Sequence, residues 1–96
     1  MYMAPVSFDW NEGNKEKNWI KHRVTIKETE QVFFNNPRII WKDDKHSTLE
    51  ERYIILGKTN MKRHLHIVYV VREEKIRVIS ARDQNKKERR FYENQS

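Results

Sequence analysis

The sequence predicts one domain of the α+β class, in which two helices precede a four-stranded antiparallel sheet and a final helix follows it. Residues 11–33 are polar, free of proline and helix-favouring, whereas residues 38–82 carry short β-branched and aromatic runs separated by polar turns. A chain of 96 residues can build one hydrophobic core but not two, so we expect a single domain over residues 1–96.

The N-terminal region contains two predicted helices after an extended opening of about ten residues. The first covers Asn11–His22, a segment rich in Lys, Glu and Asn. The second covers Ile26–Phe33, because Thr25 can cap its first turn and Glu28 stands three residues later, as in a capping box. Pro37 then marks the end of the helical region.

The remaining elements are four strands and a helix. Each strand is a short run of apolar and β-branched residues bounded by charges, and the last two are joined by only three residues, 73–75, as in an antiparallel hairpin. The predicted strands are Arg38–Lys42, Arg52–Gly57, His64–Val71 and Ile76–Arg82. The charged segment Asn85–Glu93 favours a closing helix anchored by Phe91 and Tyr92.

The charge balance indicates an anionic partner. The chain holds 20 Lys and Arg against 14 Asp and Glu, a formal charge of +6, which favours nucleic acid through steering and counterion release. Cysteine is absent, which excludes disulfides, thiolate zinc sites and a Cys nucleophile. No apolar run approaches membrane-spanning length and the N-terminus is unlike a signal peptide, so we expect a cytoplasmic protein without a membrane partner.

Short motifs along most of the chain carry a family resemblance. The most specific is the hexapeptide Arg77-Val78-Ile79-Ser80-Ala81-Arg82, which follows a hairpin and precedes a basic helix. The others are Phe8-Asp9-Trp10, Asn18, Lys21-His22, Val24-Thr25, Val32-Phe33, Pro37, Glu51-Arg52, Gly57, Glu88-Arg89 and Tyr92. With the order of elements, these motifs resemble the BrnT toxin family, whose fold is RelE-like. Arg23 departs from the glycine that the family usually carries there.

The resemblance implies an endoribonuclease that cuts RNA without a metal or other cofactor. It also implies silencing by a cognate, BrnA-like antitoxin in a hetero-oligomer. Composition alone leaves two alternatives open: a non-catalytic RNA- or DNA-binding module, and a protein whose positive surface only matches an acidic partner chain.

RNA cleavage without a metal requires a base for the 2′-hydroxyl, cations for the phosphate and an acid for the leaving oxygen. Arg77 and Arg82 are candidate phosphate ligands, Arg82 the stronger, although without the resemblance the better explanation is that both are solvated surface arginines. Residues five apart in a regular strand point to opposite faces, so the two can act together only past the end of the pleat or at a β-bulge. Ser80 is either an RNA contact or a small polar packing residue.

His22 is a candidate acid or base whose pKa the adjacent Lys21, a candidate RNA contact, can lower. The alternative is that its helix face is simply solvated. Glu51 is a candidate base and Arg52 a candidate phosphate ligand, but strand parity places them on different faces, and both can be structural ion-pair partners.

Tyr92 can stack on a base or donate a proton, although a Tyr on the last helix is more often a core anchor; Arg89 on the same helix is a candidate RNA contact. We predict no metal site. One loop contains five ionisable residues whose spacing matches no metal-ligand motif, which favours a solvated loop. They are Asp43, Asp44, His46, Glu50 and Glu51. His64 and His66 alternate along one strand, where cross-strand packing is the better explanation.

Overall fold

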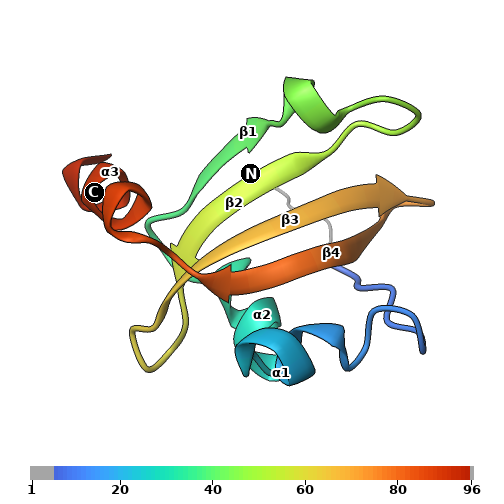
Figure 1. Cartoon of the computed structure of the whole chain (residues 1–96), viewed down its shortest axis with the longest axis horizontal. Coiled ribbons are helices and arrows are strands. Elements are labelled where there is room, and N and C mark those ends of the chain that lie inside the picture. The colour runs from blue at the N-terminus through green and yellow to red at the C-terminus, as the bar shows by residue number, and fades with distance from the viewer. Residues whose placement is uncertain (1–5, 96) are drawn as a thin grey trace.

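A computed structural model describes residues 6–95, apart from the side chains of Asn18 and Ile20, and shows a sheet with helices on one face and at one end (Figure 1). The elements in chain order are α1 (Lys17–His22), α2 (Ile26–Val32), β1 (Ile39–Lys42), the 3₁₀ helix η1 (Asp44–His46), β2 (Tyr53–Lys58), β3 (His64–Arg72), β4 (Lys75–Asp83) and α3 (Lys86–Gln95). The strands pair antiparallel in the order β1-β2-β3-β4. The predicted α+β class and four-stranded antiparallel sheet are confirmed. No helix in this part of the chain is long and apolar enough to cross a membrane.

The predicted pair of N-terminal helices needs correction, because α1 has only six residues and begins at Lys17 rather than Asn11. The Asn11 side chain accepts hydrogen bonds from the backbone amides of Gly13 and Asn14, at 2.8 and 3.2 Å. The Asn14 side chain in turn donates to the carbonyls of Asp9 and Val78. Such side-chain bonds to the backbone compete with helix formation, so residues 11–16 form turns that attach the chain to β4.

The second helix, α2, begins as predicted. The Thr25 hydroxyl accepts a hydrogen bond from the Glu28 amide at 3.0 Å, and the Glu28 carboxylate accepts one from the Thr25 amide at 3.0 Å. This is a complete capping box, so two of the amides that a helix start leaves without helical partners are satisfied.

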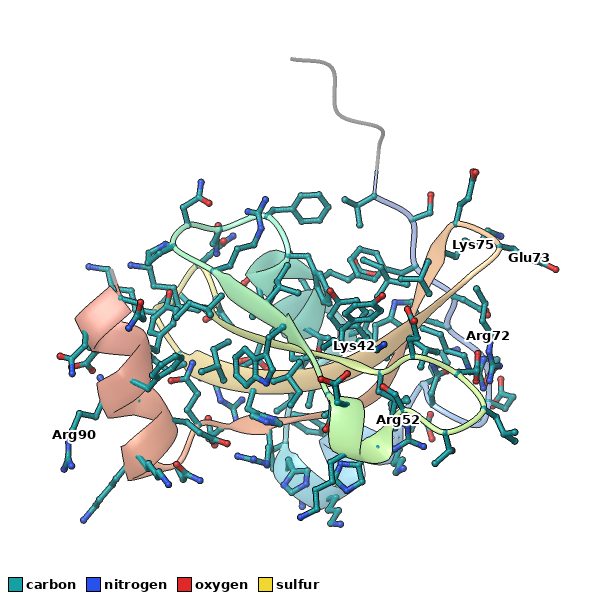
Figure 2. All side chains as sticks on the ribbon, turned by 90° about the horizontal axis from the view of Figure 1, so that it is seen from above. Lys42, Arg52, Arg72, Glu73, Lys75 and Arg90 are labelled. Carbon is teal, nitrogen blue, oxygen red and sulfur yellow. The ribbon has the colours of Figure 1, made fainter. Side chains whose placement is uncertain are left out.

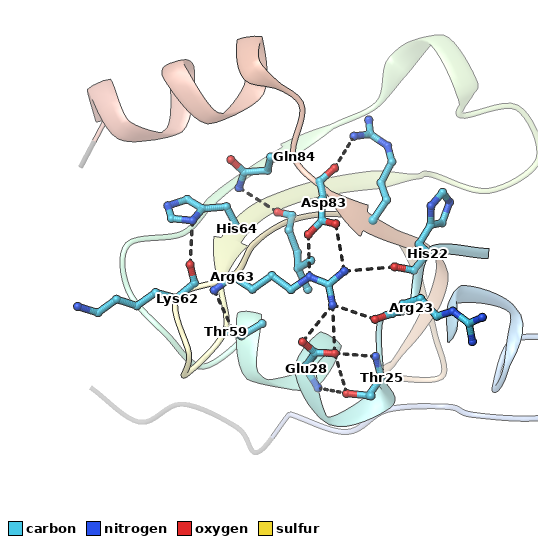
Figure 3. A network of polar contacts seen from close by, with 12 residues as sticks. His22, Arg23, Thr25, Glu28, Thr59, Lys62, Arg63, His64, Asp83 and Gln84 are labelled. Atoms are coloured by element: carbon cyan, nitrogen blue, oxygen red, sulfur yellow. Dashed lines mark hydrogen bonds and ion pairs between the residues drawn. The ribbon is translucent and has the colours of Figure 1, made fainter. Parts of the chain in front are cut away.

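Arg63, in the turn between β2 and β3, ties the N-terminal helices to the sheet (Figure 3). Its guanidinium forms ion pairs with Glu28 at 3.1 Å and Asp83 at 2.7 Å. It also donates to the backbone carbonyls of His22 and Arg23, at 3.2 and 2.9 Å. One side chain therefore holds the end of α1, the start of α2 and the end of β4 in a fixed arrangement.

The core lies between α1, α2 and one face of the sheet, which we call the closed face. Its buried residues are at most 7% exposed, and they are Val24, Val32, Phe33, Ile55, Leu65, Ile67, Tyr69, Val78 and Ala81. At Gly57 the packing is so close that an added Cβ would lie 2.7 Å from Cγ1 of Val32. Only glycine lets α2 approach β2 at this point.

The opposite face, which we call the open face, carries the polar residues of β4 because of a β-bulge. Ser80 is paired with Val68 and Val78 with Tyr69, so Ile79 is an extra residue on β4. Beyond the bulge Arg82 is paired with His66, and before it Arg77 is paired with Val70. His66 and Val70 are four apart on one strand and share a face, so Arg77, Ser80 and Arg82 all belong to the open face.

Candidate functional site

A pocket of about 340 Å³ lies on the open face, and we call it the open-face pocket. Strands β2, β3 and β4 form its floor and the loop containing η1 forms one wall. Its lining residues are Asp43, His46, Arg52, Ile54, His66, Val68, Ile79 and Ser80. The pocket therefore contains two candidates from the sequence, Arg52 and Ser80, together with two histidines and an aspartate.

Asp43 and His46 form a hydrogen-bonded pair at the pocket wall. The Nδ1 atom of His46 lies 2.9 Å from a carboxylate oxygen of Asp43. The Asp43 side chain is 15% exposed, and the Asp43 backbone is held by its amide, which donates to the carbonyl of Arg52, the residue before β2, at 2.7 Å. When Nδ1 carries the proton that Asp43 accepts, Nε2 of the exposed His46 ring has a free lone pair. That arrangement suits a general base.

His66 lies deeper in the pocket, with a side chain that is 11% exposed. Its Nε2 atom is 3.5 Å from a carboxylate oxygen of Glu88, and its buried Nδ1 has no hydrogen-bond partner among the described residues. Burial, and after it the positive charge of Arg82, lower the pKa of His66 below its ordinary value of 6.5. His66 is therefore neutral at pH 7, with Nε2 facing Glu88 and Nδ1 enclosed by the protein.

Arg82 stands beside His66 and is held by the first turn of α3. Its two terminal nitrogens donate to the two carboxylate oxygens of Glu88, at 2.8 and 2.9 Å, which raises the pKa of Arg82. Burial alone would raise the pKa of Glu88, but hydrogen bonds from Arg82 and from the Asn85 amide lower it below its usual range. Glu88 occupies one edge of the Arg82 guanidinium, and the Arg82 side chain remains 34% exposed. Its Nε hydrogen and the second hydrogen on Nη2 can therefore reach a phosphate.

Arg77 and Arg52 add positive charge to the open face. Arg77 lies 3.5 Å from the carboxylate of Asp9 and is 23% exposed. Arg52 forms no ion pair within residues 6–95, and it extends beside η1, whereas Arg72 lies toward the β3–β4 hairpin and pairs with Glu50 (Figure 2). The cation of Arg52 is thus available to an anionic ligand.

The other predicted site residues lie outside the pocket. Lys21 and His22 end α1, beside the closed face. The Glu51 carboxylate accepts hydrogen bonds from Lys42 at 3.2 Å and from the Tyr53 hydroxyl at 2.9 Å. These two partners belong to the closed-face side of β1 and β2, which agrees with the parity argument that separates Glu51 from Arg52.

On α3, Tyr92 is 2% exposed and its hydroxyl donates to the Pro37 carbonyl at 2.5 Å, the position of a core anchor. Arg89 on the same helix pairs with Glu93 at 2.8 Å.

The sequence analysis set aside two residues that the structure places in the pocket, His46 and His66. The spacing of Asp43 and His46, three apart, suits a local carboxylate–imidazole pair and was the available signal for the first. His66 became recognisable only through its pairing with Arg82, which depends on the register across the bulge. No cluster of three or more His, Asp or Glu that could hold a metal ion occurs among the described residues.

Comparison with known proteins identifies a family. Residues 10–88 match the family described as the ribonuclease toxin, BrnT, of type II toxin–antitoxin systems. No curated protein matches the chain. The matched span includes every residue that lines the open-face pocket, together with Arg77, Arg82 and Glu88, and ends before Phe91 and Tyr92 of α3.

Proposed function

The chain belongs to the BrnT family of ribonuclease toxins of type II toxin–antitoxin systems, and from this premise we propose that it cleaves RNA in the open-face pocket. The observation that carries the proposal is the convergence of the Asp43–His46 pair, His66 and Arg52 on one pocket. The bulge adds Arg82 and Arg77 on the same face. A proton acceptor beside several cations is what cleavage of a phosphodiester by its own 2′-hydroxyl requires.

In the proposed reaction the 2′-oxygen attacks the adjacent phosphorus and its proton passes to Nε2 of His46. The bond from phosphorus to the 5′-oxygen breaks, and that oxygen takes a proton from water reaching the open pocket. The hydroxide that remains takes the proton from His46, which restores both the water and the neutral base. The products are a 2′,3′-cyclic phosphate and a 5′-hydroxyl. Asp43 stabilises the imidazolium that forms on His46, in the way a carboxylate orients and supports a catalytic histidine.

Charge on the phosphate is balanced by the protein in this proposal. Arg82 and Arg77 donate to the non-bridging oxygens, and Arg52 adds a cation that has no competing ion pair within residues 6–95. Ser80, on the pocket floor, is a further hydrogen-bond donor to RNA. Because these groups supply the positive charge, we propose that cleavage needs neither a metal nor another cofactor.

We propose that the partner is a BrnA-like antitoxin that covers the open face and forms a hetero-oligomer with this single domain in the cytoplasm. Covering the arginines without partners is costly, so the antitoxin presents Asp and Glu to them together with an apolar anchor. RNA and antitoxin then exclude one another.

The test is cleavage of a fluorescent single-stranded RNA by the purified chain in excess chelator. We expect cleaved products with 2′,3′-cyclic phosphate ends, and no cleavage of the same RNA with 2′-O-methyl groups. Activity that appears only after Mg²⁺ is added would overturn metal independence. Tight RNA binding without cleavage by a folded sample would favour the non-catalytic binding module.

A further inference from the structure

A second pocket, of about 340 Å³, adjoins the first between β1 and α3, and we call it the aromatic pocket. It is lined by Trp41, Leu56, Asn85, Lys87, Glu88 and Phe91. Trp41 and Phe91 are 38% and 47% exposed, and their ring centroids lie 6.3 Å apart at an interplanar angle of 78°. Two large aromatic rings therefore meet edge to face and still leave part of each ring open to a ligand.

The two pockets share a boundary. Glu88 lines the aromatic pocket while its carboxylate binds Arg82 and lies 3.5 Å from Nε2 of His66. On the sheet, Trp41 is paired with Ile54 and Leu56 with His66, and Ile54 and His66 both line the open-face pocket. A group bound in the aromatic pocket is thus an immediate neighbour of a phosphate bound at Arg82.

The charge around the aromatic pocket suits an anionic chain. Lys87 stands at the pocket itself. The outward side of α3, across the helix from this pocket, carries Lys86, Arg89 and Arg90, and Arg90 extends away from the molecule (Figure 2). Exposed aromatic rings with a lysine beside them and further cations on the same helix are typical of surfaces that bind single-stranded nucleic acid, where bases stack and positive charge attracts the backbone.

We propose that the aromatic pocket holds a nucleobase of single-stranded RNA, from a nucleotide flanking the phosphodiester that is cleaved. The base stacks on the exposed surface of Trp41 or Phe91, and the RNA backbone passes Lys87 toward the basic outward side of α3. The inference rests on the proposed function for the identity of the RNA substrate. The inference adds a base-binding subsite to the proposed catalytic pocket. Affinity for RNA then depends on residues that take no part in proton transfer.

The experiment measures the affinity of a non-cleavable RNA of about nine nucleotides, fully 2′-O-methylated, by fluorescence anisotropy. Stacking is typically lost with the aromatic ring, so we expect Trp41→Leu and Phe91→Leu each to weaken binding by about five- to 150-fold. Trp41→Phe keeps a ring and restores most of the affinity. Trp19→Leu, which removes a similarly exposed tryptophan from α1, is the matched control and leaves the affinity unchanged.

Unchanged RNA affinity in both Trp41→Leu and Phe91→Leu, in samples that remain folded by circular dichroism, would overturn the subsite. The subsite would also be overturned if Trp41→Leu no longer bound the antitoxin but bound RNA with normal affinity. This surface would then be a protein-docking site. Because the probe cannot be cleaved, its binding is independent of catalysis. If the wild-type protein binds the probe through Trp41 but cleaves no RNA, the proposed function is contradicted and the subsite is still supported.

Discussion

The two faces of the sheet are made from alternate residues of the same strands, yet they have different roles. Along β3, Leu65 and Ile67 are completely buried under the helices of the closed face. Their neighbours His66 and Val68 turn toward the open-face pocket. The closed face supplies stability through apolar burial, and the open face supplies ionisable groups. Substitutions on the two faces should therefore separate loss of activity from loss of folding.

The largest expected effect is at His46. If it is the proton acceptor, His46→Ala lowers kcat by about 10²- to 10⁴-fold, the usual contribution of general base catalysis. His22→Ala should leave kcat unchanged, because the structure places His22 at the end of α1 beside the closed face. The measurement is single-turnover cleavage of a labelled RNA at saturating enzyme. Loss of activity in His22→Ala with full activity in His46→Ala would reverse the assignment.

Arg82→Ala is expected to lower kcat/KM by about 10²- to 10³-fold, comparable to the loss of one preorganised donor to a charged transition state. Thermal stability should fall only slightly, since the ion pair with Glu88 is partly exposed. The matched control is Arg23→Ala, which removes an exposed arginine outside the open face. Equal activity in the two variants would return Arg82 to a structural role.

On the closed face, Gly57→Ala is expected to reduce the free energy of unfolding by about 1–3 kcal/mol, the range for overpacking a core. The added methyl would lie 2.7 Å from Cγ1 of Val32, so α2 or β2 must shift. Activity per folded molecule should be nearly unchanged, because Gly57 does not line the pocket. Urea denaturation with activity measured below the transition tests both parts. Full stability would mean that α2 is less tightly packed than the structure indicates.

Local patterns predicted most of the fold. The Thr25–Glu28 capping box and the short hairpin turn are both present, and the predicted strands agree with the structure within two residues at every end. The turn is closed by Glu73 and Glu74, both with positive φ, a conformation that composition does not indicate for glutamate. The failure at Asn11 has the same origin, since Asn side chains that bind the backbone can outweigh helix propensity.

The site was less predictable, because it depends on register. Parity alone separates Arg77 from Arg82, and only the bulge at Ile79 brings them to one face. The sequence shows that a bulge would be needed but not that it occurs. His66 joins the site through its pairing with Arg82 and through α3, which brings Glu88 back to the sheet. Such contacts between distant segments have no local signal.

The smallest expected effect is a pH dependence that arises on the open face. The pKa of His66 is lowered in the folded protein, first by burial and then by Arg82, although Glu88 and Asp43 oppose the shift. The unfolded chain therefore binds this proton more readily, so the stabilising contribution is complete above pH 6.5 and is lost as the pH falls through the folded pKa. We expect the free energy of unfolding to decline as the pH is lowered from 7.5 toward 5.5. His66→Gln should flatten that decline, because its amide does not titrate. Urea denaturation at several pH values in this window tests the difference, and an equal slope in the variant would assign the dependence to other groups.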